Sequence, residues 1–381
     1  MGFAVFADGS ANLPQSMLEG IELLPMEYTV DGKPEAYWGD VDRFDARAYY
    51  DQLRSGKTIQ TSLLNTNTFL SNFKPILEAG RDIIYICMSS AISGTYNAAR
   101  SAAQELMEEY SARFVHIVDS LGCGFGSGIL AIHAAELSRQ GMAASEAAKA
   151  LDEEVPNVCQ YFTVDDLNFL RRTGRVSGMT AKIAGILNIT PILYGDATGH
   201  IVACDKVRGR KKSIEAIIRK YKEKRADIAF QRVFISHGDC LDDAEALAAR
   251  VREITPEYPV TICPHEPVSG AHVGPGMLAL FVLGKERECQ RSTINNKHLR
   301  RFDALGGDVF VESSLRLRVG IEPCSLFKRL LFGRVDRAFG NSDGKITDQI
   351  VALRHVQNPR HRFADSVVVG NVSFIPAALI P

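Results

Sequence analysis

Small hydroxyl side chains on glycine-rich turns are the residues of this sequence best suited to chemistry. Thr61-Ser62 is one such pair, Ser93-Gly94-Thr95 follows an apolar run, and His272 opens a His-Val-Gly-Pro-Gly turn. Hydroxyls and free backbone N–H groups at strand ends and helix N-termini bind anionic oxygens, because unpaired donors and the helix dipole both favour negative charge. The combination therefore indicates a site for a carboxylate or a phosphate, although a single serine such as Ser93 is more often a helix cap.

These turns need a scaffold that brings them together. Apolar runs at 3–7, 82–88 and 114–118 are each followed by a turn rich in serine and glycine and then by a helical pattern. Three such strand–loop–helix units predict an α/β fold with a parallel sheet and helices on both of its faces. Because ligands bind at the carboxyl ends of parallel strands, we expect all three turns to lie at one edge.

The remaining chain predicts three further parts. Residues around Asp31-Gly32 alternate in polarity, which favours a β-hairpin inserted at about 21–45 in an N-terminal domain of residues 1–160. Residues 161–284 mix strand and helix signals, and we expect them to form a second, α+β domain. Residues 285–381 hold 16 Lys and Arg against 10 Asp and Glu, so we leave them as an unassigned basic C-terminal extension.

Composition excludes several classes of protein. The 381 residues are 46% hydrophobic and 23% charged, which is typical of a soluble globular protein and not of a membrane-embedded or mainly disordered chain. The formal net charge of −1 gives no general attraction to nucleic acid. The cysteines form no CxxC pair, so no metal site is expected. The N-terminal sequence shows no export signal, and we expect a cytoplasmic protein.

Three familiar motifs are incomplete in this chain. Gly56-Lys57-Thr58 resembles the end of a P-loop, but Asp51 stands where that pattern needs glycine. The glycine cluster at 122–128 has Ser127 at the last glycine position of a dinucleotide loop. No serine lies in a Gly-x-Ser-x-Gly elbow, which disfavours an α/β-hydrolase.

The sequence resembles the DegV family of bacterial fatty-acid-binding proteins. The resemblance rests on FADGSANLP at 6–14, Thr61-Ser62, MSSAISGTYNAAR at 88–100 and VDSLGCGFGSG at 118–128. It continues through VDDLNFLRRTGRVS at 164–177, LNITPIL at 187–193, KVRGRKKSI at 206–214 and HVGPG at 272–276. These segments occur in the family's order over about residues 1–284.

The resemblance implies a function in lipid metabolism. Family members are binding subunits with two α/β domains that enclose one long-chain fatty acid, such as palmitate, in a buried tunnel. They need no cofactor of their own, because a separate kinase subunit brings ATP and phosphorylates the carboxylate to an acyl phosphate for phospholipid synthesis. The chain would then be a lipid-binding subunit and not itself an enzyme, and transient contact with a membrane is a further expectation.

The resemblance also implies roles for individual residues. Thr61 and Ser93 resemble the carboxylate's hydroxyl donors, with Ser62, Gly94 and Thr95 beside them, and His272 resembles the group that helps to hold the carboxylate for transfer. Arg208 resembles a contact for the kinase subunit. The basic cluster of Arg171 and Arg172, continued by Arg175, is a second partner contact or a solvated face.

An acyl chain would supply most of the binding energy. At about 0.8 kcal/mol for each buried CH₂, a sixteen-carbon chain gains on the order of 10 kcal/mol before ordering costs. We expect the following residues to contribute to the tunnel wall, with an ordinary core role as the alternative: Ile186, Leu187, Ile189, Ile192 and Leu278.

Two other functions and an unassigned segment remain open. A self-sufficient acyl hydrolase would pair Ser93 or Ser120 with His272, with a third group orienting the histidine. A lipid-responsive regulatory sensor would use the basic extension. Within that extension, alternation at 309–321 predicts a strand, and an apolar stripe at 326–335 indicates a small extra domain or a basic helix that touches a partner or an anionic membrane.

Overall fold

The computed structural model describes residues 2–176, 189–226, 231–285, 287, 351–353 and 367–369. The chain divides into two units, Met1–Gln290 and Arg291–Pro381, so the first unit runs beyond the expected boundary at 284. In the second unit, β14 (Val351–Leu353) pairs antiparallel with β15 (Val367–Val369). The strand and the apolar stripe expected at 309–321 and 326–335 lie outside the described residues.

The first unit begins with the expected parallel sheet, which has the strand order β2-β1-β6-β7. The pairs β1–β2, β1–β6 and β6–β7 are all parallel. The strands are β1 (Ala4–Asp8), β2 (Ile21–Leu24), β6 (Ile83–Cys87) and β7 (Val115–Asp119). The helices around this sheet are α2 (Thr66–Glu78), α3 (Thr95–Glu109), α4 (Phe125–Arg139) and α5 (Ala144–Glu154).

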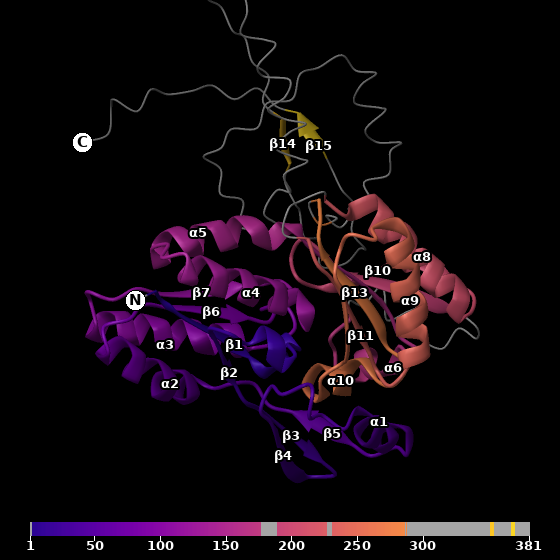
Figure 1. Cartoon of the computed structure of the whole chain (residues 1–381), viewed down its shortest axis with the longest axis horizontal. Coiled ribbons are helices and arrows are strands. Elements are labelled where there is room, and N and C mark those ends of the chain that lie inside the picture. The colour runs from indigo at the N-terminus through magenta and orange to yellow at the C-terminus, as the bar shows by residue number, and fades with distance from the viewer. Residues whose placement is uncertain are drawn as a thin grey trace, which may run out of the picture. The chain divides into compact units, whose positions relative to one another are not determined.

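Alternating side chains of these strands meet different helices. In β1, Val5 and Ala7 belong to the core cluster built with α4 and α5, whereas Ala4 and Phe6 belong to the cluster built with α2 and α3. Figure 1 shows α2 and α3 on one side of this sheet and α4 and α5 on the other. Because helices cover both faces, every residue of β1 and β6 is buried, whereas the edge strand β2 exposes Glu22 and β7 carries the half-buried His116.

The expected hairpin occupies a shorter range than 21–45. It consists of β3 (Met26–Val30) and β4 (Lys33–Tyr37), and β5 (Ile59–Thr61) pairs on the other side of β3. Ile21–Leu24 joins the parallel sheet instead. The helix α1 (Ala46–Arg54) follows the hairpin, and Tyr49 and Tyr50 on this helix are buried.

The second sheet has six strands in the order β10-β9-β8-β13-β11-β12. They are β8 (Val158–Thr163), β9 (Thr190–Gly195), β10 (Ile201–Val207), β11 (Val233–His237), β12 (Val260–Pro264) and β13 (Leu278–Leu283). The neighbours β11 and β12 are parallel and the other pairs are antiparallel. The two short helices are α6 (Asn168–Arg172) and α10 (Pro267–Val273).

One face of this second sheet is covered by α8 (Arg210–Lys224) and α9 (Leu241–Ile254), as Figure 1 shows. Ile192 and Leu278 are fully buried in the core under these helices. Of the two roles expected for them, tunnel wall or ordinary core, they take the core role, because their side chains point to the face of the sheet that α8 and α9 cover. Residues 186 and 187 lie outside the described residues.

The opposite face of the second sheet contacts the first half of the chain through an aromatic cluster. Phe125, at the start of α4, stacks on Phe234 of β11 with ring centroids 4.6 Å apart. It also meets Phe281 of β13 edge to face at 5.9 Å. Buried aromatic contacts of this kind fix one layer against the other.

Candidate functional site

A cavity of about 210 Å³ lies beside this aromatic cluster. It is larger than the roughly 150 Å³ apolar cavity that accommodates benzene in a well-studied case. Its walls come from the loops that follow the strands of the parallel sheet, from the second sheet and from α10. The apolar side chains that dominate the lining include Met88, Phe162, Leu170, Met277, Ala279 and Phe281.

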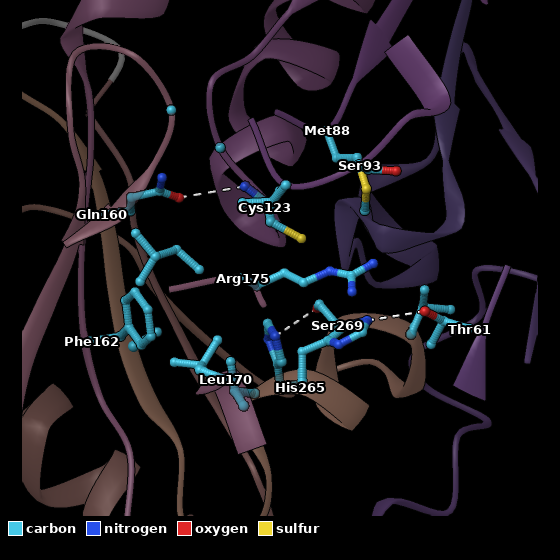
Figure 2. Close-up of a pocket in the computed structure, with 18 of the residues that line it drawn as sticks. Thr61, Met88, Ser93, Cys123, Gln160, Phe162, Leu170, Arg175, His265 and Ser269 are labelled. Atoms are coloured by element: carbon cyan, nitrogen blue, oxygen red, sulfur yellow. Dashed lines mark hydrogen bonds between the residues drawn. The ribbon is translucent and has the colours of Figure 1, made fainter. Parts of the chain in front are cut away.

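Two of the expected hydroxyl residues lie on one side of this cavity. Figure 2 shows Thr61 and Ser93 on that side, with Phe162 and Leu170 on the other. Thr61 is the last residue of β5, and Ser93 lies two residues before Thr95, the first residue of α3. The Ser93 Oγ accepts from the backbone N–H of Thr95 at 3.2 Å, so this serine stabilises the turn that leads into α3, whose N-cap residue is Gly94, and it also borders the cavity.

Thr61 and His272 are in direct contact. The Thr61 Oγ1 lies 3.0 Å from the His272 Nε2. When Nε2–H donates to Thr61, the threonine hydroxyl hydrogen is left available for an anionic oxygen in the cavity. The His272 Nδ1 is buried and has no hydrogen-bond partner in the described structure.

His272 owes its position to the short helix α10. Pro267 is the first residue of this helix, and the Glu266 carboxylate caps it by accepting from the backbone N–H groups of Val268 and Ser269 at 2.6 and 2.8 Å. Gly274, with φ +76°, ends the helix, and a Cβ there would lie 2.5 Å from Phe169. Glycine is therefore required at position 274 by both backbone conformation and space.

Arg175 is a site residue that the sequence did not single out from its basic cluster. Its side chain extends across the cavity, and Figure 2 shows the guanidinium directed toward the side that carries Thr61 and Ser93. Arg171 and Arg172 are exposed and do not line the cavity. The Arg172 guanidinium lies 4.7 Å from the ring centroid of Phe169.

The electrostatics of the site favour a bound anion. Burial, together with the positive charge of Arg175, lowers the pKa of His272 to about 4, so the imidazole is neutral at neutral pH. A neutral imidazole still donates one N–H, while Arg175 supplies the positive charge that a buried carboxylate needs. The site therefore combines hydroxyl donors, a neutral imidazole and one cation.

A second histidine lines the cavity in a different hydrogen-bond network. The His265 Nε2 lies 2.7 Å from the Ser269 Oγ, and its Nδ1 lies 3.1 Å from the Ser236 Oγ. Burial lowers the pKa of His265 to about 3. The Ser269 hydroxyl also donates to the Glu266 carboxylate. Because a hydroxyl has one hydrogen, Ser269 cannot at the same time donate to His265, as a catalytic serine must donate to its base.

The other expected residues take different positions. Ser62 and Gly94 line the cavity, whereas Thr95 is fully buried behind Ser93 and its Oγ1 accepts from the backbone N–H of Leu64 at 3.3 Å. Arg208 is exposed and does not line the cavity.

The serine–histidine pair that the hydrolase alternative needs is not formed by the residues named for it. His272 contacts Thr61, the Ser93 Oγ lies 3.0 Å from the Thr95 Oγ1, and the Ser120 Oγ donates to the carbonyl of Gly122 at 3.3 Å. A general base must lie within hydrogen-bond reach of its nucleophile. This arrangement does not support the pairing of His272 with Ser93 or Ser120.

Comparison with known proteins places the chain in a family. The model of the DegV family, described as an uncharacterised protein family, matches residues 2–285. The chain belongs to the DegV family. A DegV domain-containing protein of Clostridium perfringens is 34% identical over 287 residues, which cover 75% of this chain and 99% of that protein.

Solved DegV structures have the same fold. A Thermotoga maritima protein whose structure revealed a fatty-acid-binding function is 27% identical, with a TM-score of 0.63 over 74% of this chain and 99% of the other. DegV of Bacillus subtilis, a fatty-acid-binding protein, is also 27% identical, with a TM-score of 0.64 over 75% of this chain and 100% of the other. The α/β fold with a parallel sheet, which the sequence predicted, is thereby confirmed.

Two features are absent from the described part of the DegV chain. Among the residues that the structure describes, no group of three or more His, Cys, Asp or Glu side chains is placed to hold a metal ion. Within the same described ranges, no helix combines the length and the apolar character needed to cross a membrane.

Proposed function

We propose that this DegV protein binds one long-chain fatty acid in the cavity, with the carboxylate at Thr61, Ser93 and His272. The observation that carries the proposal is the 3.0 Å contact between Thr61 and His272 at the edge of a mainly apolar cavity. The hydroxyls donate to the carboxylate oxygens, and Arg175 balances their charge. DegV proteins of known structure that bind fatty acids support this reading.

The two parts of a fatty acid would have separate roles in binding. Burying the acyl chain against Phe162, Leu170 and Phe281 supplies most of the free energy, at about 0.8 kcal/mol for each CH₂ before ordering costs. Each charge-assisted hydrogen bond at the carboxylate adds roughly 1.5–3 kcal/mol. The polar end thereby fixes the orientation of the ligand in the cavity.

The bound carboxylate is presented to a separate kinase subunit, which brings ATP and forms the acyl phosphate. This chain is then a binding subunit that works in the cytoplasm, where ATP is available. Arg208, Arg171 and Arg172 are exposed and free of the cavity, which suits a contact with that subunit.

Native mass spectrometry of the purified protein, followed by organic extraction, tests the binding. The expected result is one fatty acid of about 14 to 18 carbons per chain, lost or reduced in a Thr61→Ala/Ser93→Ala double variant. An empty protein that also refuses added palmitate overturns the proposal.

The partner step has its own test. When the protein loaded with palmitate is mixed with a fatty-acid kinase subunit and ATP, hydroxylamine should trap the acyl phosphate as a hydroxamate. An Arg208→Glu variant should still bind palmitate and yield at least about tenfold less hydroxamate, the effect of losing one charged contact. Equal yields from both proteins would exclude Arg208 from the contact.

A further inference from the structure

Arg287 is a buried arginine that lies two residues beyond the end of the family match at 285. Only 5% of its surface is exposed. Its guanidinium donates to the backbone carbonyls of Val158 at 2.6 Å and Ser120 at 2.9 Å, and to that of Leu121. Its described hydrogen bonds all go to the main chain, so this side chain fixes backbone geometry instead of pairing with a carboxylate.

Leu121, one of the three acceptors, has an unusual backbone conformation. Its φ is +50°, in the left-handed region that a bulky residue rarely adopts. Its N–H donates to the Asp119 carboxylate at 3.2 Å, and its carbonyl accepts from the Gln160 Nε2 at 3.3 Å as well as from Arg287. Strained conformations of this kind persist only where surrounding contacts hold them.

The strained residue leads directly into the cavity wall. Gly122 and Cys123, the next two residues, line the cavity together with Gln160. The backbone N–H of Cys123 donates to the Gln160 Oε1 at 3.4 Å, an interaction marked in Figure 2. The direction in which the chain leaves Leu121 therefore sets where this wall stands.

We propose that Arg287 is a positioning residue for the ligand cavity: it holds Leu121 in the left-handed conformation and so fixes the wall at Gly122 and Cys123. The inference about affinity rests on the proposed fatty-acid function. The inference about the position of the wall is independent of that function, because it concerns the protein without ligand.

The primary experiment measures palmitate dissociation constants and the free energy of unfolding for the full-length chain and for Arg287→Met and Arg287→Lys. Arg287 does not line the cavity and acts only through the wall that it holds, and we expect Arg287→Met to weaken palmitate binding about tenfold. Arg287→Lys keeps the positive charge but lacks the planar guanidinium group. Its affinity for palmitate should lie between those of the wild type and Arg287→Met. The exposed neighbour Lys285→Met should bind as the wild type does.

Two further variants separate positioning from general stability. Leu247→Ala removes a buried side chain of α9, away from the cavity, and should lower stability while leaving palmitate affinity unchanged. Leu121→Gly removes the strain, because glycine adopts positive φ freely. When Leu121→Gly is already present, adding Arg287→Met should reduce palmitate affinity less than about threefold. Such a non-additive effect is typical of coupled residues. An equal loss in both backgrounds overturns the proposal.

A readout without ligand distinguishes this inference from the fatty-acid function. A thiol reagent followed by peptide mass spectrometry gives the labelling rate of Cys123 in the empty protein. Arg287→Met should change that rate at least about threefold relative to Leu247→Ala, even if no palmitate binds to any variant. An unchanged rate with unchanged affinity contradicts the positioning role.

Discussion

The Thr61 hydroxyl and the His272 imidazole lie 3.0 Å apart, although 211 positions separate them in the sequence. Thr61 is the last residue of β5, which pairs with the hairpin strand β3, and His272 lies in the last turn of α10. The contact joins the N-terminal and C-terminal parts of the first unit at the cavity edge. It leaves the threonine available to an anion when the imidazole donates the hydrogen.

Removing either hydroxyl should weaken fatty-acid binding. We expect Thr61→Val and Ser93→Ala each to raise the dissociation constant for palmitate about tenfold, since each removes one hydrogen bond to a charged group. Isothermal titration measures the change. Ser101→Ala on the exposed face of α3 is the matched control and should bind normally; equal affinity in all four proteins would remove the hydroxyls from the site.

Arg175 should contribute to palmitate binding, whereas its basic neighbour Arg172 should not. Arg175→Met removes the cation that reaches into the cavity, and we expect at least about tenfold weaker palmitate binding. Arg172→Met removes an exposed cation three residues earlier and should leave the affinity unchanged. A competition assay with a fluorescent fatty acid measures both. Similar losses in the two variants would indicate a general charge effect instead of a contact.

The contrast between these two arginines shows what the sequence could and could not predict. Both stand in one basic run, and no pattern in that run separates them. In the structure α6 ends at Arg172, and Gly174 with φ +71° redirects the chain, so that Arg175 enters the cavity. By contrast, Thr61, Ser93 and His272 stand in sequence segments whose residue types already indicated anion binding, and all three line the cavity.

The cavity wall was harder to predict than the polar end. In β13 every residue from Leu278 to Leu283 is buried, so its apolar run carries no alternation that marks one face. Ala279 and Phe281 face the cavity while Leu278 and Leu280 face α8 and α9. Only the packing of the second sheet on the first half of the chain decides which set meets the ligand.

Glu266 should make the stability of the protein depend on pH. Burial raises the pKa of this carboxyl from 4.5 to about 7, so the folded protein holds a proton that the unfolded chain has already released. The free energy of unfolding should therefore fall as pH rises from about 4.5 to 7, relative to Glu266→Gln, by roughly 3 kcal/mol. Urea unfolding of both proteins at several pH values measures this difference. If the difference in unfolding free energy between the two proteins stays constant from about pH 4.5 to 7, the prediction is wrong.

Phe125 should be important for stability because it joins the two sheets. Its ring packs on Phe234 and Phe281, and none of its surface is exposed. Phe125→Ala should lower the free energy of unfolding by about 3–5 kcal/mol, as other buried phenylalanine truncations do. Trp38, with 73% of its surface exposed, is the control, and Trp38→Ala should change stability by less than about 0.5 kcal/mol. Comparable effects of the two substitutions in chemical denaturation would contradict the role of the aromatic cluster.

The most direct test of the central claim is the carboxyl resonance of bound palmitate labelled with ¹³C at carbon 1. In the wild type, hydroxyl donors and Arg175 stabilise the carboxylate, so the bound resonance should titrate at lower pH than that of free palmitate. Thr61→Val and Arg175→Met should each shift it and raise its titration pH. A bound resonance that titrates as free palmitate does, and that neither substitution moves, would contradict the placement of the carboxylate at this site.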